Sequence, residues 1–143
     1  MSQDDVKGRF WLTPPDLMER LSTEFGFDFD AAPYPRPAGF NSLTAEWGRS
    51  TWVNPPVDHG SSITAWVKKG VEENKKGKLV VMLLPFPRWF RYLLAVDAEF
   101  RFPGPIHFLS PDGRRAPSEG GGRIPDILAI LRPMTAQSRR TKA

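Results

Sequence analysis

The chain has 143 residues, of which 40% are hydrophobic and 25% are charged. This composition is typical of a globular protein, and the length suits one domain with its own hydrophobic core. No apolar run approaches the roughly 20 residues that cross a bilayer. The first ten residues are acidic and polar, whereas a secretory signal is basic and then apolar. We therefore expect a cytoplasmic protein without a membrane span.

The residue types that are missing limit the chemistry further. The chain has no cysteine and only two histidines, His59 and His107. Disulfides, thiolate catalysis, iron–sulfur clusters and cysteine-ligated zinc are therefore excluded, and we expect no metal site. The formal net charge of +4 favours a polyanionic partner, because lysines and arginines that neutralise phosphates release counterions.

The start of the chain predicts one helix and one short strand. Thr13 is followed by two prolines and Asp16, which is typical of an N-cap with an acidic first turn, and the helix is expected to end near Phe25. The inward-facing positions would be Leu17, Leu21 and Phe25. Residues 27–30 alternate apolar and acidic side chains, as in a strand, and a proline-rich loop follows.

The middle of the chain predicts two strands with a helix between them. Residues 51–53 form a strand candidate that stops at Asn54, because the next two prolines donate no ladder hydrogen bond. A serine at 61 or 62 would cap a helix that Gly77 terminates. The lysines of this region are expected to form a solvated face: Lys68, Lys69, Lys75, Lys76 and Lys78. Residues 79–84, LVVMLL, match a strand buried on both faces.

The last third predicts three more strands, at residues 99–102, 106–109 and 127–131. Residues 103–105, Pro-Gly-Pro, separate the first two strands like a hairpin turn. Residues 110–123 contain four glycines and two prolines and are expected to form a mobile loop.

The alternation of helical and extended patterns predicts an α/β fold. We expect a single domain over residues 1–143, in which a central, mostly parallel sheet is flanked by helices. The two ends of this domain, about residues 1–8 and 134–143, are expected to be flexible.

The segment Asn54-Pro55-Pro56-Val57 carries the most informative chemistry. An asparagine at a strand end, followed by two prolines, forms a rigid and narrow acceptor site that suits an exocyclic amine. Adenine N6 is a poor nucleophile because its lone pair is delocalised into the ring. If the Asn54 side-chain oxygen and the Pro55 carbonyl accept its two hydrogens, the nitrogen becomes pyramidal and reactive. The alternative is that the two prolines merely form a turn.

Several segments, in this order along the chain, resemble the phage-type DNA N6-adenine methyltransferase family. The resemblance spans most of the chain and rests on Trp11-Leu12-Thr13-Pro14, Phe29-Asp30-Ala31-Ala32, Trp47, Trp52-Val53-Asn54-Pro55-Pro56, Trp66-Val67-Lys68-Lys69 and Leu83-Leu84-Pro85. It implies a minimal Rossmann-like methyltransferase domain that transfers a methyl group from S-adenosylmethionine to adenine N6 in DNA, in a bacterial or phage-infected cell. The base would be flipped out of a duplex or met in a single strand.

The resemblance also assigns residues to a cofactor site. Thr13 and Pro14 would approach the methionine end of S-adenosylmethionine, and Asp30 with Ala31 would line its pocket. Asn54 would face cofactor and substrate together. A carboxylate at the C-terminal edge of parallel strands can hold a ribose hydroxyl or an ammonium group. The alternative for Asp30 is a loop-capping role.

Two positions depart from the family pattern. Val57, the last residue of the catalytic motif Asn54, Pro55, Pro56 and Val57, stands where the family has an aromatic residue that stacks on the extruded base. Such stacking contributes about 1 to 3 kcal/mol, so we expect weakened catalysis. Phe86 or Trp89 could supply a ring from another side. Gly104-Pro105-Ile106 replaces a Gly-Arg-Ile pattern, which would remove a contact to substrate or phosphate.

Candidate DNA contacts follow the strand that ends at Leu84-Pro85 or lie in the glycine-rich loop: Phe86, Arg88, Trp89, Arg91, Arg114, Arg115 and Arg123. Two other functions stay open. A degenerate methyltransferase could act as a cofactor- or DNA-binding module, which Val57 favours. Methylation of a protein glutamine amide would use the same acceptor geometry, although the basic charge argues against it.

Overall fold

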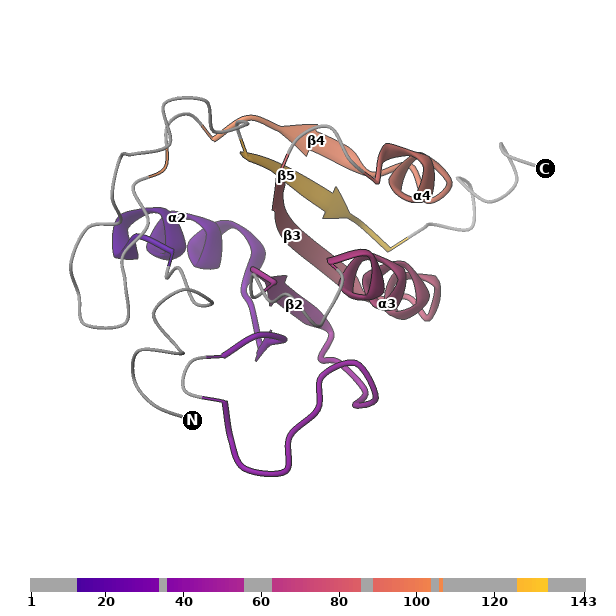
Figure 1. The fold of residues 1–143 in the computed structure, drawn as a ribbon. Coiled ribbons are helices and arrows are strands. Elements are labelled where there is room, and N and C mark those ends of the chain that lie inside the picture. Colours follow the sequence, from indigo (N-terminus) through magenta and orange to yellow (C-terminus); the bar gives the residue numbers. More distant parts are fainter. Residues whose placement is uncertain are drawn as a thin grey trace.

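The computed structural model describes residues 13–33, 36–55, 63–85, 89–103, 106 and 126–133. Its helices and strands follow one another along the chain as shown in Figure 1: α2 (Pro15–Phe25), β1 (Phe29–Asp30), β2 (Ser50–Val53), α3 (Ile63–Lys75), β3 (Leu79–Pro85), α4 (Phe90–Leu94), β4 (Glu99–Arg101) and β5 (Asp126–Leu131). The expected α/β class is confirmed. No helix in these ranges is long and apolar enough to cross a membrane.

The five strands form one sheet in the order β1-β2-β3-β5-β4. β1, β2 and β3 are parallel to one another, whereas β5 is antiparallel to both of its neighbours. The expected mostly parallel sheet is therefore confirmed at the β1 end and wrong at the β5 end. A parallel neighbour requires a long crossover, usually helical, and the sequence between β4 and β5 is rich in glycine and proline instead.

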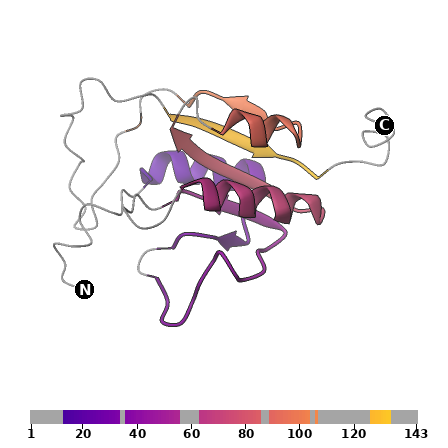
Figure 2. The ribbon, with the colours of Figure 1, turned by 45° about the vertical axis from the view of Figure 1, so that its right-hand side comes forward.

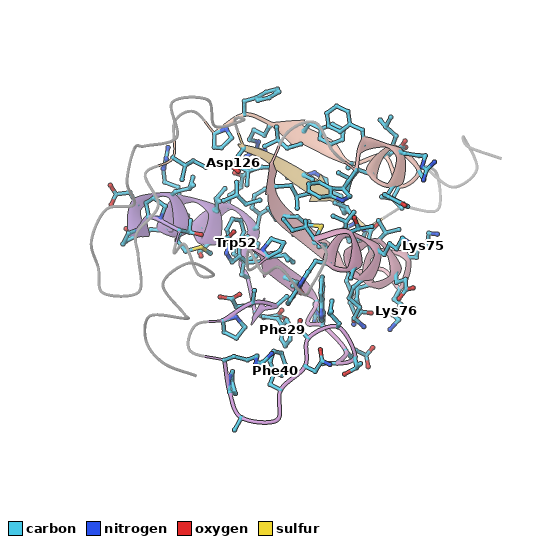
Figure 3. The ribbon with its side chains drawn as sticks, viewed as in Figure 1. Phe29, Phe40, Trp52, Lys75, Lys76 and Asp126 are labelled. Atoms are coloured by element: carbon cyan, nitrogen blue, oxygen red, sulfur yellow. The ribbon has the colours of Figure 1, made fainter. Side chains whose placement is uncertain are left out.

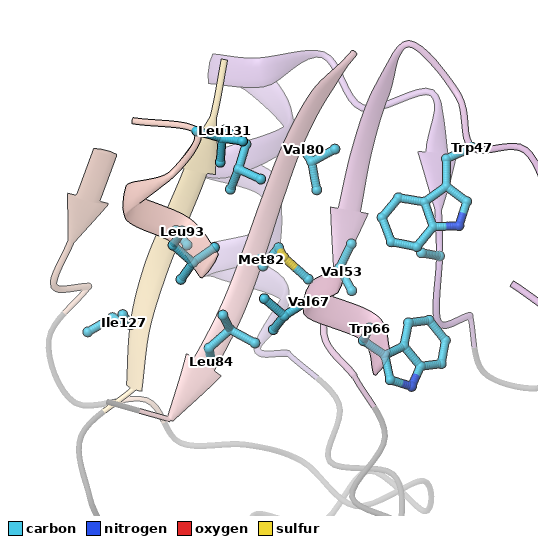
Figure 4. Close-up of a cluster of buried hydrophobic side chains, with 13 residues drawn as sticks. Trp47, Val53, Trp66, Val67, Val80, Met82, Leu84, Leu93, Ile127 and Leu131 are labelled. Atoms are coloured by element: carbon cyan, nitrogen blue, oxygen red, sulfur yellow. The ribbon is translucent and has the colours of Figure 1, made fainter. Parts of the chain in front are cut away.

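Helices cover both faces of the sheet, with α2 on one side and α3 and α4 on the other (Figure 2). Successive side chains of β3 point to opposite faces, so Val80, Met82 and Leu84 pack with α3 and α4, as Figure 4 shows. Val81 and Leu83 pack against α2. The strand predicted at 79–84 from its continuous apolar run is confirmed, since it is buried on both faces.

The first described helix begins one residue later than its sequence pattern predicts. The N-cap of α2 is Pro14, no side chain caps the helix, and the prediction of Thr13 as N-cap is wrong. Pro14 precedes Pro15, and a residue before proline is kept out of the helical region; its ψ is 137°. The predicted inward positions are confirmed, because Leu17, Leu21 and Phe25 are buried.

Glu73 is fully buried near the end of α3. Its Oε1 accepts a hydrogen bond from the Trp47 backbone N–H. Three lysine Nζ atoms lie within ion-pair distance of the carboxylate: Lys69 at 3.7 Å, Lys76 at 2.7 Å and Lys78 at 3.2 Å. Burial would raise the pKa of Glu73, but its hydrogen bonds and the nearby lysine charges outweigh burial and lower the pKa to about 2. The predicted solvated face is therefore wrong for Lys69 and Lys78, whose side chains are only 12% and 13% exposed, whereas Lys76 is exposed as predicted although it pairs with Glu73.

The described C-terminal part of the chain contains two of the three predicted strands and one helix that was not predicted. The strands expected at 99–102 and 127–131 are confirmed as β4 and β5, which pair with each other. Ile106 belongs to no strand, and residues 107–109 lie outside the described part, as do the serine caps and the segments 1–8, 110–123 and 134–143. The short helix α4 has no counterpart in the sequence analysis. Its N-cap is Trp89, which has a φ of +69°, a backbone conformation that the sequence pattern does not indicate.

Candidate active site

The C-terminal ends of the parallel strands meet at one edge of the sheet. Asp30 ends β1 and pairs with Trp52 of β2, and Asn54 directly follows β2. The Ala31 N–H donates to the Trp52 carbonyl at 2.9 Å, which extends the pairing past the end of β1. Ligands of α/β sheets bind at this kind of edge. The strand order thus brings two of the predicted site residues to the same edge.

Asn54 is held in place from another part of the chain. Its Nδ2 lies 3.2 Å from Thr13 Oγ1, a hydrogen bond between residues that are 41 positions apart. The hydroxyl that was expected to cap α2 instead accepts from the asparagine. Because the amide nitrogen donates to Thr13, the plane of the Asn54 amide is fixed, and its half-buried side chain has a defined orientation. Pro55, the next residue, is buried.

Asp30 forms a tight local turn at the end of β1. Its Oδ1 accepts the Ala32 backbone N–H at 3.0 Å, so the expected loop-capping contact is present. Asp30 is exposed, but the protein around its carboxyl partly desolvates it and raises the pKa of Asp30, and the hydrogen bond from Ala32 opposes that rise. Ala31 is buried among the hydrophobic residues that face α3. Its side chain therefore points into the core, and only its backbone belongs to the edge.

Trp89 and Arg91 lie beyond the end of β3, on the side covered by α3 and α4. The Trp89 Nε1 donates to Thr64 Oγ1 at 2.7 Å and thereby joins the start of α4 to the first turn of α3. Its half-buried ring packs against the hydrophobic core. Arg91 is exposed, and its guanidinium lies 5.3 Å from the centre of the Tyr92 ring.

The sequence analysis does not predict the polar roles of two residues in α3, Thr64 and Trp66. Thr64 carries the hydrogen bond to Trp89, and no local sequence pattern indicates a contact over 25 residues. Trp66 of α3 is buried, but its Nε1 has no acceptor among the described residues. A buried tryptophan normally finds a partner for this N–H group.

Several predicted site residues lie outside the described residues: Pro56, Val57, Phe86, Arg88, Gly104, Pro105, Arg114, Arg115 and Arg123. Their roles stay predictions. The polar side chains that are described at the edge are an amide, a hydroxyl and a carboxylate, from Asn54, Thr13 and Asp30. Together they can accept hydrogen bonds from an amine, a hydroxyl or an ammonium group.

The sequence of the chain was compared with known proteins, known structures and protein families. Curated proteins and solved structures give no match to the chain. A family model does match, and it covers residues 2–142, nearly the whole sequence. That model describes the DNA N-6-adenine-methyltransferases (Dam), so the chain belongs to this family.

Proposed function

We propose that the chain transfers the methyl group of S-adenosylmethionine to N6 of adenine in DNA. The observation that carries the proposal is the Asn54 side chain, which the Thr13 hydroxyl orients where β2 ends. The neighbouring parallel strand ends in Asp30, so an acceptor for an amine and a carboxylate share one sheet edge. The family supports adenine in DNA as the acceptor of the methyl group.

Asn54 would act on the nucleophile. Adenine N6 attacks poorly while its lone pair is shared with the ring. An amide oxygen that accepts one N6 hydrogen, together with the Pro55 carbonyl for the other, favours a pyramidal nitrogen whose lone pair points away from the ring plane. The bond from Asn54 to Thr13 reduces the reorganisation needed for this contact, since the amide is already oriented.

The residues on the cofactor side fit a ligand that carries hydroxyl and ammonium groups. When bound, S-adenosylmethionine supplies an electrophilic methyl group. The Asp30 carboxyl is partly desolvated, which raises its pKa, and a hydroxyl or ammonium partner would stabilise its charged form. Thr13 and Pro14 would border the methionine end, and Ala31 would offer its backbone.

Arg91 and Trp89 are the two candidate DNA contacts that lie within the described residues. Arg91 is exposed, so a phosphate can reach it, whereas the indole N–H of Trp89 already donates a hydrogen bond to Thr64. A base inside a duplex cannot reach the edge of the sheet, so the target adenine would be flipped out or met in a single strand.

The deciding experiment is incubation of the protein with DNA and S-adenosylmethionine labelled in its methyl group. We expect label in DNA that is recovered as N6-methyladenine. Asn54→Ala should lower the rate by about 100- to 1000-fold, because one preorganised acceptor is lost. Asn54→Asp keeps acceptor oxygens at the same position and should retain more activity than Asn54→Ala. Equal rates in the wild type and Asn54→Ala would contradict the mechanism.

Val57 favours a second candidate, a binding module that keeps the site but turns over poorly. A valine offers no extended π-face to an adenine, and base stacking contributes about 1 to 3 kcal/mol. If the pocket is otherwise intact, Val57→Tyr should raise the methylation rate by roughly tenfold. Cofactor binding with no methylation by either protein would favour the binding module.

A further inference from the structure

Two cations, one from α3 and one from α4, lie beside the ring of Tyr92 on the face of the sheet that these helices cover. The Nζ of Lys68, in α3, is 5.5 Å from the centre of this ring, and the guanidinium of Arg91, in α4, is 5.3 Å from it. Arg91 Nη2 also lies 3.4 Å from the Tyr92 hydroxyl. We call these three residues the Tyr92 cluster. Lys68 and Arg91 are exposed, so a partner in solution can reach both.

The Tyr92 cluster differs from the other basic clusters of the described chain in its counter-charges. Lys69, Lys76 and Lys78 surround the Glu73 carboxylate, and Arg101 lies 2.7 Å from Glu24. Within the described ranges, no carboxylate comes within ion-pair distance of Lys68 or Arg91. Two positive charges beside one ring raise the local positive potential, which attracts an anion.

Tyr92 adds a neutral donor at the same place. Its hydroxyl accepts from Arg91, so its own proton can be directed toward an anion. The hydrogen bond from Arg91, and then the charge of Lys68, lower the pKa of this phenol, which makes its O–H a stronger donor. An ammonium and a guanidinium from two helices thus lie beside one phenol, and such donors suit a phosphate group.

The position of the cluster relates it to the proposed active site. Thr64 and Lys68 are four residues apart in α3 and share one helix face. Trp89 bonds to Thr64, and Tyr92 follows Trp89 by three residues. The cluster therefore lies one helical turn, about 5.4 Å, beyond the bond that joins the starts of α3 and α4. Both helices start near the edge of the sheet at which β2 and β3 end.

We infer that Lys68, Arg91 and Tyr92 form a contact site for a phosphate of the DNA backbone, which positions the strand whose adenine enters the edge at Asn54. This inference rests on the proposed function for the identity of the polyanion. It names the residues that attract the DNA backbone, whereas family membership and the net charge do not identify any. A phosphate contact positions DNA without reading its sequence, so the site should serve every sequence alike.

The test is fluorescence anisotropy with a labelled DNA duplex, and with one of its single strands, at several salt concentrations. Lys68→Gln and Arg91→Gln should each weaken binding about three- to tenfold and reduce the slope of log affinity against log salt by about 1. Arg91→Lys keeps the charge and should keep the slope. Tyr92→Phe keeps the ring and should weaken binding by a few-fold without changing the slope.

Arg20→Gln is the matched control. Arg20 is exposed on α2, on the opposite face of the sheet, and its loss removes the same charge (Figure 2). It should leave both affinity and slope unchanged. Thermal unfolding of each variant checks that the fold is intact, and cofactor titration should show unchanged affinity for S-adenosylmethionine.

The outcomes separate this site from the proposed function. Equal slopes in the wild type, Lys68→Gln and Arg91→Gln would overturn the phosphate site, even if methylation is intact. An absence of DNA binding by the wild type at low salt would overturn both. Slopes that fall by about 1 in both variants, in a protein that never methylates DNA, would support the site and contradict the proposed reaction.

Discussion

The two edges of the sheet each hold a carboxyl group whose pKa is shifted, and the shifts have opposite directions. At the edge where the parallel strands begin, three lysines and the Trp47 backbone surround Glu73 and lower its pKa. At the edge where they end, desolvation raises the pKa of Asp30. The protein therefore stabilises the charge of one group and penalises the charge of the other. Unfavourable local energies of this kind are expected at functional sites.

The Glu73 edge is also joined by hydrogen bonds between a helix and two strands. Asn74, beside Glu73, lies with its Nδ2 at 2.9 to 3.1 Å from three backbone carbonyls, of Lys78, Leu131 and Arg132. It joins the end of α3 to β5 and to the start of β3. Figure 3 shows Lys75 and Lys76 at this end and Asp126, which pairs with the end of β3, at the other. The bonds of Asn74 and the ion pairs of Glu73 thus join α3 to the neighbouring strands at this edge, whereas the edge at Asn54 is the one proposed above to bind cofactor and substrate.

Removal of the charge at Glu73 should give the largest effect on stability. Glu73→Gln leaves three lysines without their carboxylate and should lower the free energy of unfolding by about 2 to 4 kcal/mol, measured by urea denaturation. Cofactor affinity should stay unchanged at a temperature where the variant is folded. The double variant Glu73→Gln with Lys78→Met tests the pairing, because it should be less destabilised than the sum of the single variants.

The wild type should also lose stability in acid through Glu73. Its pKa in the folded protein is about 2, below the ordinary value of 4.5, so the stabilisation is fully present above pH 4.5. It decreases as the pH falls from 4.5 through about 2, because the unfolded chain takes up the proton first. Urea unfolding at stepped pH values should show a weaker dependence in Glu73→Gln. Identical curves for the two proteins would contradict the buried ion cluster.

Asp30→Asn should have the opposite signature. The asparagine oxygen can still accept the Ala32 N–H group, and loss of the charge removes a desolvation penalty at neutral pH. We expect the free energy of unfolding to be unchanged or slightly higher. Affinity for S-adenosylmethionine should fall by about tenfold or more, because hydrogen bonds to a charged group are the stronger ones. Titration calorimetry measures the affinity, and unchanged binding would remove Asp30 from the cofactor site.

The sequence predicts the Asn54 edge better than the Glu73 edge, and the reason is physical. Asp30 and Asn54 follow extended segments, and parallel strands bring such positions together without further information. Glu73 has a polar sequence neighbourhood, and its burial depends on Trp47 and Lys78, which only the fold brings near it. Local patterns also predict β3 and the end of α3 shortly before Gly77, because they depend on neighbouring residues alone.

Elsewhere the local pattern and the tertiary structure disagree. The helix α4 has five residues, too few for a periodic signal, and its start depends on the bond from Trp89 to Thr64. The antiparallel position of β5 between β3 and β4 depends on strand pairing over more than 40 residues, which no motif indicates. The predicted cap at Thr13 fails because a second proline follows the first, which moves the N-cap by one residue.

The smallest expected effect, from Thr13→Val, tests whether the Asn54 edge is preorganised. Valine keeps the shape of threonine but cannot accept the hydrogen bond from Asn54 Nδ2, so the amide loses its fixed orientation. We expect kcat to fall about three- to tenfold, the cost of one neutral hydrogen bond, with little change in KM for DNA. The melting temperature should change by no more than about 2 °C, because Thr13 does not cap α2 and the substitution opens no cavity.

Thr13→Ser keeps the hydroxyl and should retain kcat. If valine and serine reduce kcat equally, the methyl group of Thr13 matters and its hydroxyl does not. If Thr13→Val leaves kcat unchanged, the substrate and not Thr13 orients Asn54 for catalysis. The Asn54 edge would then adapt to its ligand instead of being preorganised.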